Sequence, residues 1–316
     1  MILRIITKEN MKYKIAQIIP YFGKWPEWIN LYFYSCSQNP MMDFIYYTDC
    51  PIPEKKYNNL FFHKCSFDEY KSFVSRRLGI DYRNVSPYKL TDLKPFLGLV
   101  HEQELRDYVF WAFGDIDLVY GNLSRWINEI TLTKYDIITT HAYRIAGHFC
   151  IIRNNDYYRN LCLKIKDWQV GLCENRHYAY DELAWSQLVN TWEHFISRLY
   201  RYFLCNLGFS RDRVFGVMNS LLYKKIYNQE LLTTPYPQPV SYEEKMYPLT
   251  WEYDLRKGTI LSPDGAILPY LHFMAFKKCQ YVDTEQYWKE DFYNVEFPIE
   301  QYKSIHFNYK GVFGIK

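Results

Sequence analysis

The stretch WAFGDIDLVYG, residues 111–121, places two aspartates at the end of a run of apolar residues. The segment DYVFWAF (107–113) is typical of a buried central strand, and a buried carboxylate is costly unless it is paired or binds a metal ion. Residues i and i+2 of an extended segment point to the same side, so Asp115 and Asp117 can face one ligand. Open α/β sheets bind ligands just beyond the ends of their strands. The stretch therefore indicates a site for a charged ligand, although the two acids can also serve a turn or a helix cap.

The segments around this strand alternate between strands and helices. We expect strands at 14–20, 42–49, 59–66, 107–113, 135–141 and 147–154, and further strands within 266–278 and 304–316. We expect helices at 26–37, 66–80, 91–105 with an interruption near Pro95, 155–168, and from Asp181 to about residue 203. Ser66 and Glu69 have the spacing of a capping box. This order predicts an α/β layer architecture, with the mixed region 205–260 as an insertion or subdomain.

Composition indicates a soluble globular protein and argues against a nucleic-acid partner. The 316 residues contain 38 Lys and Arg against 35 Asp and Glu, a balance without the charge excess of a nucleic-acid-binding protein. Eight cysteines without a CxxC pair predict reduced thiols and a cytoplasmic location. The first residues predict neither a signal peptide nor a membrane span, which leaves peripheral contact with the inner membrane face open. The 32 tyrosines can form platforms for sugar rings, or reflect residue usage alone.

The aspartate pair suits a divalent cation. Mg²⁺ or Mn²⁺ is commonly held by one or two carboxylates, and substrate phosphates complete the coordination. His272 and His306 are alternative third ligands, with His272 preferred. Lys277, five residues after His272, can neutralise a departing phosphate. Each histidine can equally be an ordinary buried side chain.

Other segments carry polar side chains that can line the same cleft. They are Lys89, Asp92 and Lys94 in SPYKLTDLKP, Gly147 and His148 in GHFCIIRN, and Asp181 and Glu182 in YAYDELAW. The lysines offer cations to phosphate, and the carboxylates offer acceptors to sugar hydroxyls. Acids at the start of a helix can instead satisfy the free N–H groups of the first turn, so both interpretations of Asp181 and Glu182 stay open.

An ordered set of motifs carries a resemblance to a known family. The motifs are IIPYFGKWPEWINLYFYSCSQNPMMDFIYYTD, SPYKLTDLKP, FWAFGDIDLVYG, GHFCIIRN, YDE and LPYLHFMAFKK, over residues 14 to 278. The chain resembles nucleotide-sugar-dependent glycosyltransferases of the GT-A fold, and more closely a family of bacterial glycosyltransferase-like proteins from polysaccharide gene clusters. The resemblance implies a Rossmann-like α/β fold, in which helices flank a central, mixed but mostly parallel sheet, with a C-terminal, acceptor-side helical elaboration. It implies one catalytic domain over 1–316, with a donor-binding half at 12–145 and an acceptor half at 146–316.

The resemblance also implies roles for individual residues. Asp115 and Asp117 match the Asp-x-Asp motif that holds a nucleoside-diphosphate sugar through Mn²⁺ or Mg²⁺. The predicted donor-binding set comprises Tyr21, Gly23 and Asp49 at the nucleoside, Lys89 and Asp92 at the phosphate and sugar, and Asp115, with His148 added from its place in the cleft. His272 and Lys277 resemble the late His-and-Lys segment of retaining enzymes. Neither His272 nor His306 is followed by the full Gly and Lys-Pro-Trp pattern of that group.

The predicted activity is metal-dependent hexosyl transfer in bacterial surface polysaccharide synthesis. The expected donor is a UDP-sugar, and the expected acceptor is a hydroxyl of a glycan or glycolipid. The His272–Lys277 segment favours retention, in which the departing phosphate takes the acceptor proton. An inverting enzyme needs a carboxylate base, for which Asp181 and Glu182 are the candidates.

Two alternatives belong to other classes. DIDLV fits the nucleophile motif of haloacid-dehalogenase-like phosphatases, but those enzymes carry it after their first strand, and Asp115 follows about 110 residues of expected α/β structure. A non-catalytic carbohydrate-binding protein would account for the many aromatic residues but not for the charged segments.

Overall fold

The computed structural model describes most of the chain, with gaps. The described residues are 14–141, 144–189, 199, 202–204, 206–208, 226–228, 233, 241–242, 245–246, 250–262, 265–273, 293–308 and 311–316. Lys277, most of residues 190–203 in the expected helix 181–203, and much of the expected insertion 205–260 lie outside them. No helix in the described part of the chain has the length and hydropathy needed to cross a bilayer.

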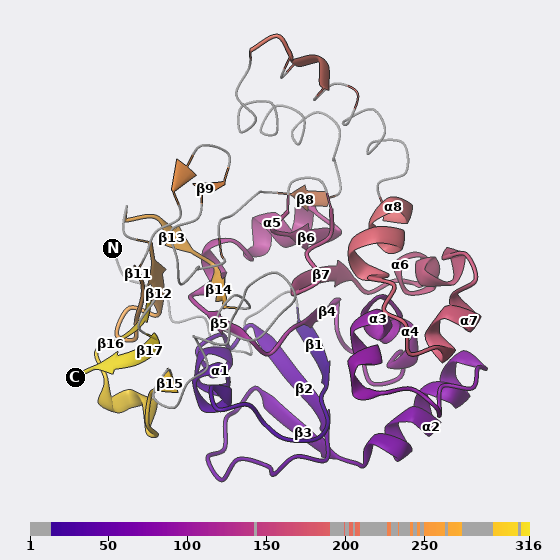
Figure 1. Ribbon diagram of the computed structural model, residues 1–316, viewed down its shortest axis with the longest axis horizontal. Coiled ribbons are helices and arrows are strands. Elements are labelled where there is room, and N and C mark those ends of the chain that lie inside the picture. Colours follow the sequence, from indigo (N-terminus) through magenta and orange to yellow (C-terminus); the bar gives the residue numbers. More distant parts are fainter. Residues whose placement is uncertain are drawn as a thin grey trace.

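A seven-stranded sheet forms the centre of the molecule (Figure 1). Its order is β3 (Leu60–Lys64), β2 (Met42–Thr48), β1 (Ile15–Pro20), β4 (Phe110–Gly114), β7 (Phe149–Arg153), β6 (Ile137–Thr139) and β8 (Ile226–Asn228). Only β7 runs antiparallel to its two neighbours, and the other pairs within this sheet are parallel. The predicted mixed but mostly parallel sheet is therefore confirmed, and one strand from the region expected as an insertion belongs to it.

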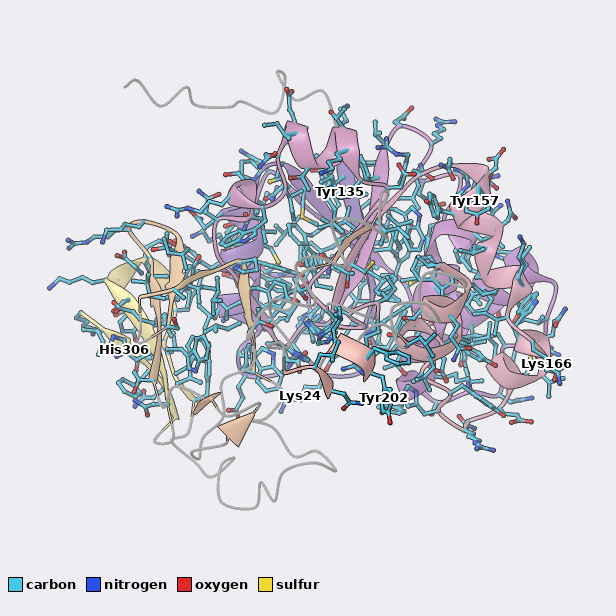
Figure 2. All side chains as sticks on the ribbon, turned by 90° about the horizontal axis from the view of Figure 1, so that it is seen from above. Lys24, Tyr135, Tyr157, Lys166, Tyr202 and His306 are labelled. Carbon is cyan, nitrogen blue, oxygen red and sulfur yellow. The ribbon has the colours of Figure 1, made fainter. Side chains whose placement is uncertain are left out.

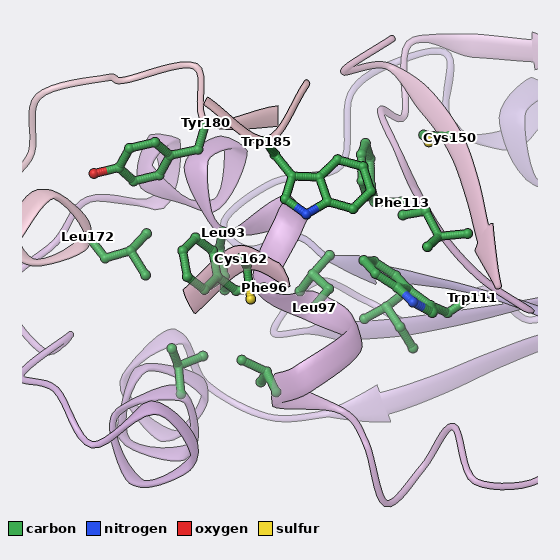
Figure 3. Packing of buried hydrophobic residues seen from close by; sticks show 14 of the residues in the cluster. Leu93, Phe96, Leu97, Trp111, Phe113, Cys150, Cys162, Leu172, Tyr180 and Trp185 are labelled. Atoms are coloured by element: carbon green, nitrogen blue, oxygen red, sulfur yellow. The ribbon is translucent and has the colours of Figure 1, made fainter. Parts of the chain in front are cut away.

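Both faces of this sheet are buried, because apolar residues occupy both sides of its central strands. In β4, Trp111 and Phe113 face one hydrophobic cluster, and Phe110 and Ala112 face another. On the first face Trp185 joins Trp111 and Phe113, together with residues of the short helices around it (Figure 3). Continuous burial of this kind is typical of a sheet covered by helices on both sides.

The described helices are mostly shorter than the sequence predicts. They are α1 (Ile29–Ser37), α2 (Phe67–Leu78), α3 (Leu90–Leu93), α4 (Leu97–Val100), α5 (Glu129–Lys134), α6 (Asp156–Asn160), α7 (Trp168–Cys173) and α8 (Ser186–Val189). The interruption expected near Pro95 is confirmed: the segment 91–105 contains α3, a 3-10 turn at Lys94–Phe96 and α4, since Pro95 has no N–H for a helical bond. The capping box of Ser66 and Glu69 at the start of α2 is confirmed.

A second sheet replaces the expected helical elaboration in the described C-terminal residues. Its order is β13 (Ile267–Leu268), β12 (Thr259–Leu261), β11 (Thr250–Asp254), β16 (Ser304–Asn308), β17 (Gly311–Ile315) and β15 (Tyr293–Asn294). That prediction was wrong for these residues because TWEYD alternates, with Trp251 and Tyr253 buried and the residues between them half-buried, which is the period of a strand. The one strand expected within 304–316 is a hairpin of two, β16 and β17.

Helix α1 and a two-stranded ladder connect the two sheets. One side of α1, with Tyr32 and Phe33, packs on the central sheet, and the other, with Leu31 and Tyr34, packs on the second sheet. The ladder pairs β5 (Leu118–Tyr120), which directly follows the aspartate stretch, with β14 (Tyr270–His272). The strand at residues 270–272 thus lies beside residues 118–120.

Two further strands, β9 (Ser241–Tyr242) and β10 (Lys245–Met246), form a small hairpin.

Candidate metal site and its surroundings

The end of β4 carries a cluster of three residues that could hold a cation. The nearest ligand atoms of Asp115, Asp117 and His272 all lie within 4.8 Å of one another. The Nε2 atom of His272 is 3.4 Å from Oδ2 of Asp117 and 4.0 Å from Oδ2 of Asp115. Two carboxylates and an imidazole are a ligand set that suits Mn²⁺ and is compatible with Mg²⁺. The structure brings together the three residues that the sequence predicts as metal ligands.

Hydrogen bonds to the backbone hold the segments that carry these side chains. Leu118 opposes His272 in the β5–β14 ladder, and the N–H of Phe273 donates to the carbonyl of Asp117 at 3.1 Å. Trp28, just before α1, donates its indole N–H to the carbonyl of Ile116 at 2.9 Å. The turn between the two aspartates is therefore held from both sides.

The alternative third ligand, His306, lies elsewhere. It belongs to β16 of the second sheet (Figure 2). Its Nε2 atom is 3.9 Å from Oε1 of Glu252 on the neighbouring strand. The cation-ligand cluster found among the described residues contains His272 and not His306.

Lys94 is the cation nearest to this cluster in the described structure. Its Nζ atom is 2.5 Å from Asp115 Oδ1, 2.9 Å from the carbonyl of Gly147 and 3.8 Å from Asp181 Oδ2. Burial alone would lower the pKa of Lys94, but Asp115 and Asp181 outweigh it and hold this pKa above its ordinary value. Lys94 therefore stays charged between two carboxylates.

Asp181 lies at the same place, at the start of a short π-helix, Asp181–Trp185. Burial raises the pKa of Asp181 to about 6, and the ammonium of Lys94 opposes this rise. Its Oδ1 accepts the N–H of Glu182 at 2.8 Å. Counted with Asp115 and Asp117, three carboxylates face one ammonium, so the site has an excess of negative charge that a divalent cation would neutralise.

Close packing at Gly147 keeps Asp181 in this position. A Cβ atom at Gly147 would lie 2.5 Å from Asp181 Oδ2 and 3.2 Å from Cγ of Glu182. The carboxylate of Glu182 is paired with Arg144 at 2.7 Å, and it is the less buried of the two acids. Of the two predicted base candidates, the structure places Asp181 beside the cation cluster and Glu182 in an ion pair.

His148 forms one wall of the site. Its ring stacks on the ring of His272, with 4.2 Å between the centroids and 24° between the planes. Its Nε2 atom is 2.7 Å from the hydroxyl of Tyr270, and its backbone carbonyl accepts the N–H of Asp115 at 2.9 Å. Burial lowers the pKa of His148 well below its ordinary value, with a further contribution from His272, so this imidazole is neutral.

The predicted nucleoside loop is held against the end of β2. The N–H of Gly23, whose φ is +107°, donates to Asp49 Oδ1 at 2.7 Å. The Tyr21 ring stacks on Trp25 at 5.1 Å, and the Trp25 indole donates to the carbonyl of Pro51. Positive φ at Gly23 favours glycine, because a Cβ atom strains this conformation. The structure brings Tyr21, Gly23 and Asp49 together, and their contact with a nucleoside stays a prediction.

Lys89 and Asp92, which the sequence resemblance assigns to the donor, form a buried ion pair with each other. Their side chains are 0% exposed and form an ion pair at 2.8 Å. Asp92 also accepts the backbone N–H groups of Tyr178 and Tyr180, and Lys89 donates to the carbonyl of Arg176. A pair enclosed in this way has no polar atom left facing a cleft. We interpret it as a structural contact that fixes the segment leading into Asp181, and the predicted donor contact has no support in this geometry.

The sequence identifies Lys94 as a possible cation but does not place it in the predicted donor-binding set. It gives no role to Tyr270 or Arg144, which contact His148 and Glu182. One pattern could have found Tyr270: it precedes His272 by two residues in a strand, so both side chains lie on the same side. Lys277 lies outside the described residues.

Comparison with known proteins gives a family and distant structures. No curated protein matches the chain. Two crystal structures of the glycosyltransferase GlyE from Streptococcus pneumoniae TIGR4 are similar to it at 12% and 11% identity, with TM-scores of 0.31 and 0.28. Each alignment covers 68% of this chain and 54% of the GlyE chain, so the protein spans about half of GlyE. A family model described as a family of unknown function, DUF6625, matches residues 17–231, and the chain belongs to this family.

Proposed function

We propose that this protein is a metal-dependent glycosyltransferase that moves a sugar from a nucleoside-diphosphate sugar to an acceptor hydroxyl. The observation that carries the proposal is the convergence of Asp115, Asp117 and His272 within 4.8 Å at the end of β4. The end of a strand in an open α/β sheet is where such folds bind ligands. The ordered motifs that resemble glycosyltransferases select this activity among the reactions a metal site can serve.

The residues present fit Mn²⁺ or Mg²⁺. Asp115, Asp117 and His272 would hold the ion, which supplies positive charge to a diphosphate as it leaves. The surplus of carboxylates over ammonium groups described above favours a doubly charged ion. Lys94 stays protonated beside Asp115 and offers a second positive charge at the same position.

Asp181 is the group that can hold or move a proton here. A carboxylate whose pKa is raised to about 6 is partly protonated near neutral pH and can accept a proton from a hydroxyl or donate a hydrogen bond to one. In the retaining reaction that the sequence favours, the departing phosphate takes the acceptor proton and Asp181 orients sugar hydroxyls. The anomeric configuration of the product, measured by NMR, distinguishes this role from that of a base in an inverting reaction.

The finer assignments rest on sequence resemblance. We propose a UDP-sugar as the donor, with its nucleoside at the loop of Tyr21 and Gly23 beside Asp49. We propose a glycan or glycolipid of bacterial surface polysaccharide synthesis as the acceptor. Lys277 is proposed to contact the leaving phosphate.

A thermal-shift and turnover screen tests the proposal. Purified protein is heated with UDP-glucose, UDP-galactose and their N-acetyl forms, with Mn²⁺ or with EDTA, and donor hydrolysis is followed in parallel. We expect stabilisation and hydrolysis that require Mn²⁺, because a ligand that binds only the folded protein raises its stability. Asp115→Asn, Asp117→Asn and His272→Ala should lose both effects, and His306→Ala serves as the matched control that keeps them. Full turnover in EDTA, or in the Asp117→Asn variant, would contradict the proposal.

Two added samples in this screen, p-nitrophenyl phosphate and free sugars, separate the two alternatives. A phosphatase would release phosphate from p-nitrophenyl phosphate through a covalent Asp115, and a carbohydrate-binding protein would bind free sugars without Mn²⁺. Asp115 follows β4, the fourth strand among the described residues, whereas the phosphatase pattern requires the first.

A further inference from the structure

His148 contacts two of the three candidate metal ligands. Its backbone carbonyl accepts the N–H of Asp115 at 2.9 Å, and its ring lies against the ring of His272 with centroids 4.2 Å apart. It precedes β7, which runs antiparallel to β4, so the start of β7 meets the end of β4 at one edge of the sheet.

Tyr270 fixes the ring of His148 in turn. The Tyr270 hydroxyl is 2.7 Å from Nε2 of His148, and the same hydroxyl is hydrogen-bonded to Oγ1 of Thr140. Tyr270 is fully buried and stands two residues before His272 in β14, so the phenol and the ligand imidazole project from the same side of one strand. The strand, the phenol and the two stacked rings form a closed loop of contacts.

A ring held on one face and at one edge has little freedom to rotate. His272 is 5% exposed and His148 is 7% exposed, so solvent does not offer either ring an alternative position. Metal-binding histidines depend on neighbours that orient the ring, and loss of such a neighbour typically weakens metal binding about 10- to 100-fold. The stacked imidazole of His148 is placed to do this for His272.

We propose that His148 and Tyr270 are positioning residues for His272, and that their side chains set the affinity of the site for a divalent cation. This inference rests on the proposed metal-dependent function, because it requires that His272 bind the ion. The two side chains act through the orientation of one ring. They are distinct from the three ligands, and His148 has no part in contacting the donor in this proposal.

The test measures Mn²⁺ affinity directly, with no substrate present. Free Mn²⁺ is followed by its EPR signal during titration of the metal-free protein, and the variants are His148→Ala, Tyr270→Phe, His272→Ala and the double variant His148→Ala with His272→Ala. We expect His148→Ala to weaken binding about tenfold or more and Tyr270→Phe to weaken it less, about threefold. In the His272→Ala background, His148→Ala should change the affinity by less than about twofold, because its effect passes through the absent ring.

If His148 and Tyr270 had only a structural role, their variants would lose stability without a specific loss of Mn²⁺ affinity. Ser66→Ala, which removes the cap of α2, is the matched control: it should lower the melting temperature and leave Mn²⁺ affinity unchanged. If His148→Ala fails to fold, Tyr270→Phe, which removes only a hydroxyl, provides the measurement.

Three results would overturn the positioning role of His148 and Tyr270. Wild-type affinity in a folded His148→Ala or, failing that, in Tyr270→Phe would overturn it and leave the proposed function intact. Equal losses from His148→Ala with and without His272 would also overturn it. Absence of Mn²⁺ binding by the wild-type protein would overturn the inference and the proposed metal site together.

Discussion

A substitution in the buried pair of Lys89 and Asp92 tests whether this pair stabilises the fold or contacts the donor. The sequence resemblance assigns both residues to the donor, whereas the structure encloses them, with both side chains 0% exposed. The informative change is Asp92→Asn, which removes the negative charge and keeps the shape. A structural pair should then show itself in the free energy of unfolding, and a donor contact should show itself in binding.

The structure predicts unequal costs for the two partners. Without the charge of Asp92, Lys89 keeps only uncharged partners, namely the amide oxygen of the substituted side chain, the carbonyl of Arg176 and the faces of two tyrosine rings. An uncompensated buried charge of this kind costs about 3–5 kcal/mol. In Lys89→Met, by contrast, Asp92 keeps the N–H groups of Tyr178 and Tyr180, so we expect a smaller loss of about 1–3 kcal/mol.

Urea unfolding followed by tryptophan fluorescence measures these free energies, and Mn²⁺-dependent binding of a UDP-sugar is measured at low temperature on the same samples. The matched control is Asp107→Asn, whose ion pair with Arg106 is 81% and 80% exposed, and which should change stability by less than about 0.5 kcal/mol. We expect Asp92→Asn to be destabilised and still to bind the donor. Wild-type stability together with lost donor binding would refute the structural interpretation and restore the contact predicted from the sequence.

Three other changes test the site and its frame. Folding raises the pKa of Asp181 from 3.8 to about 6, so the folded state holds this proton more tightly than the unfolded state. The free energy of unfolding of the metal-free protein should therefore fall by roughly 3 kcal/mol between about pH 4 and pH 6. Urea titrations should show a smaller fall in Asp181→Asn, and an equal fall in both proteins would contradict the assignment. Gly147→Ala places a Cβ atom 2.5 Å from Asp181 Oδ2, and should cost about 1–3 kcal/mol in urea unfolding and reduce transfer activity, whereas unchanged values of both would show that the carboxylate moves freely. Ser66→Ala breaks the capping box of α2 and should cost about 1 kcal/mol without altering the activity of the folded protein, which a melting curve and a donor-hydrolysis assay check together.

Local features of the fold could be predicted from the sequence, because local physics determines them. The apolar run ending at Pro20 is β1, and the capping box at Ser66 starts α2 where expected. The aspartate pair stands at the end of a buried strand, as its apolar neighbours indicate. In each case a few adjacent residues carry the whole signal.

The second sheet could not be predicted in the same way. Its central pair joins β11 at 250–254 with β16 at 304–308, and such pairing across the chain leaves no mark in either segment alone. The sequence also could not show which of Lys89 and Lys94 reaches the candidate metal site. Both lie in one motif, five residues apart along a run of short helices, but Lys89 pairs with Asp92 inside the protein, whereas Lys94 reaches Asp115.

The direction of β7 explains why the candidate site assembles where it does. In an all-parallel sheet the start of β7 would lie at the edge opposite the end of β4, and His148 would be a strand's length from Asp115. Because β7 is antiparallel to β4, Phe149 pairs with Gly114, and the residues just before one and just after the other become neighbours. Gly147, His148 and Asp115 therefore meet at a single edge, where Lys94 bridges Asp115 and the Gly147 carbonyl. The antiparallel direction of β7 thus gathers the charged groups of the site at the C-terminal end of β4.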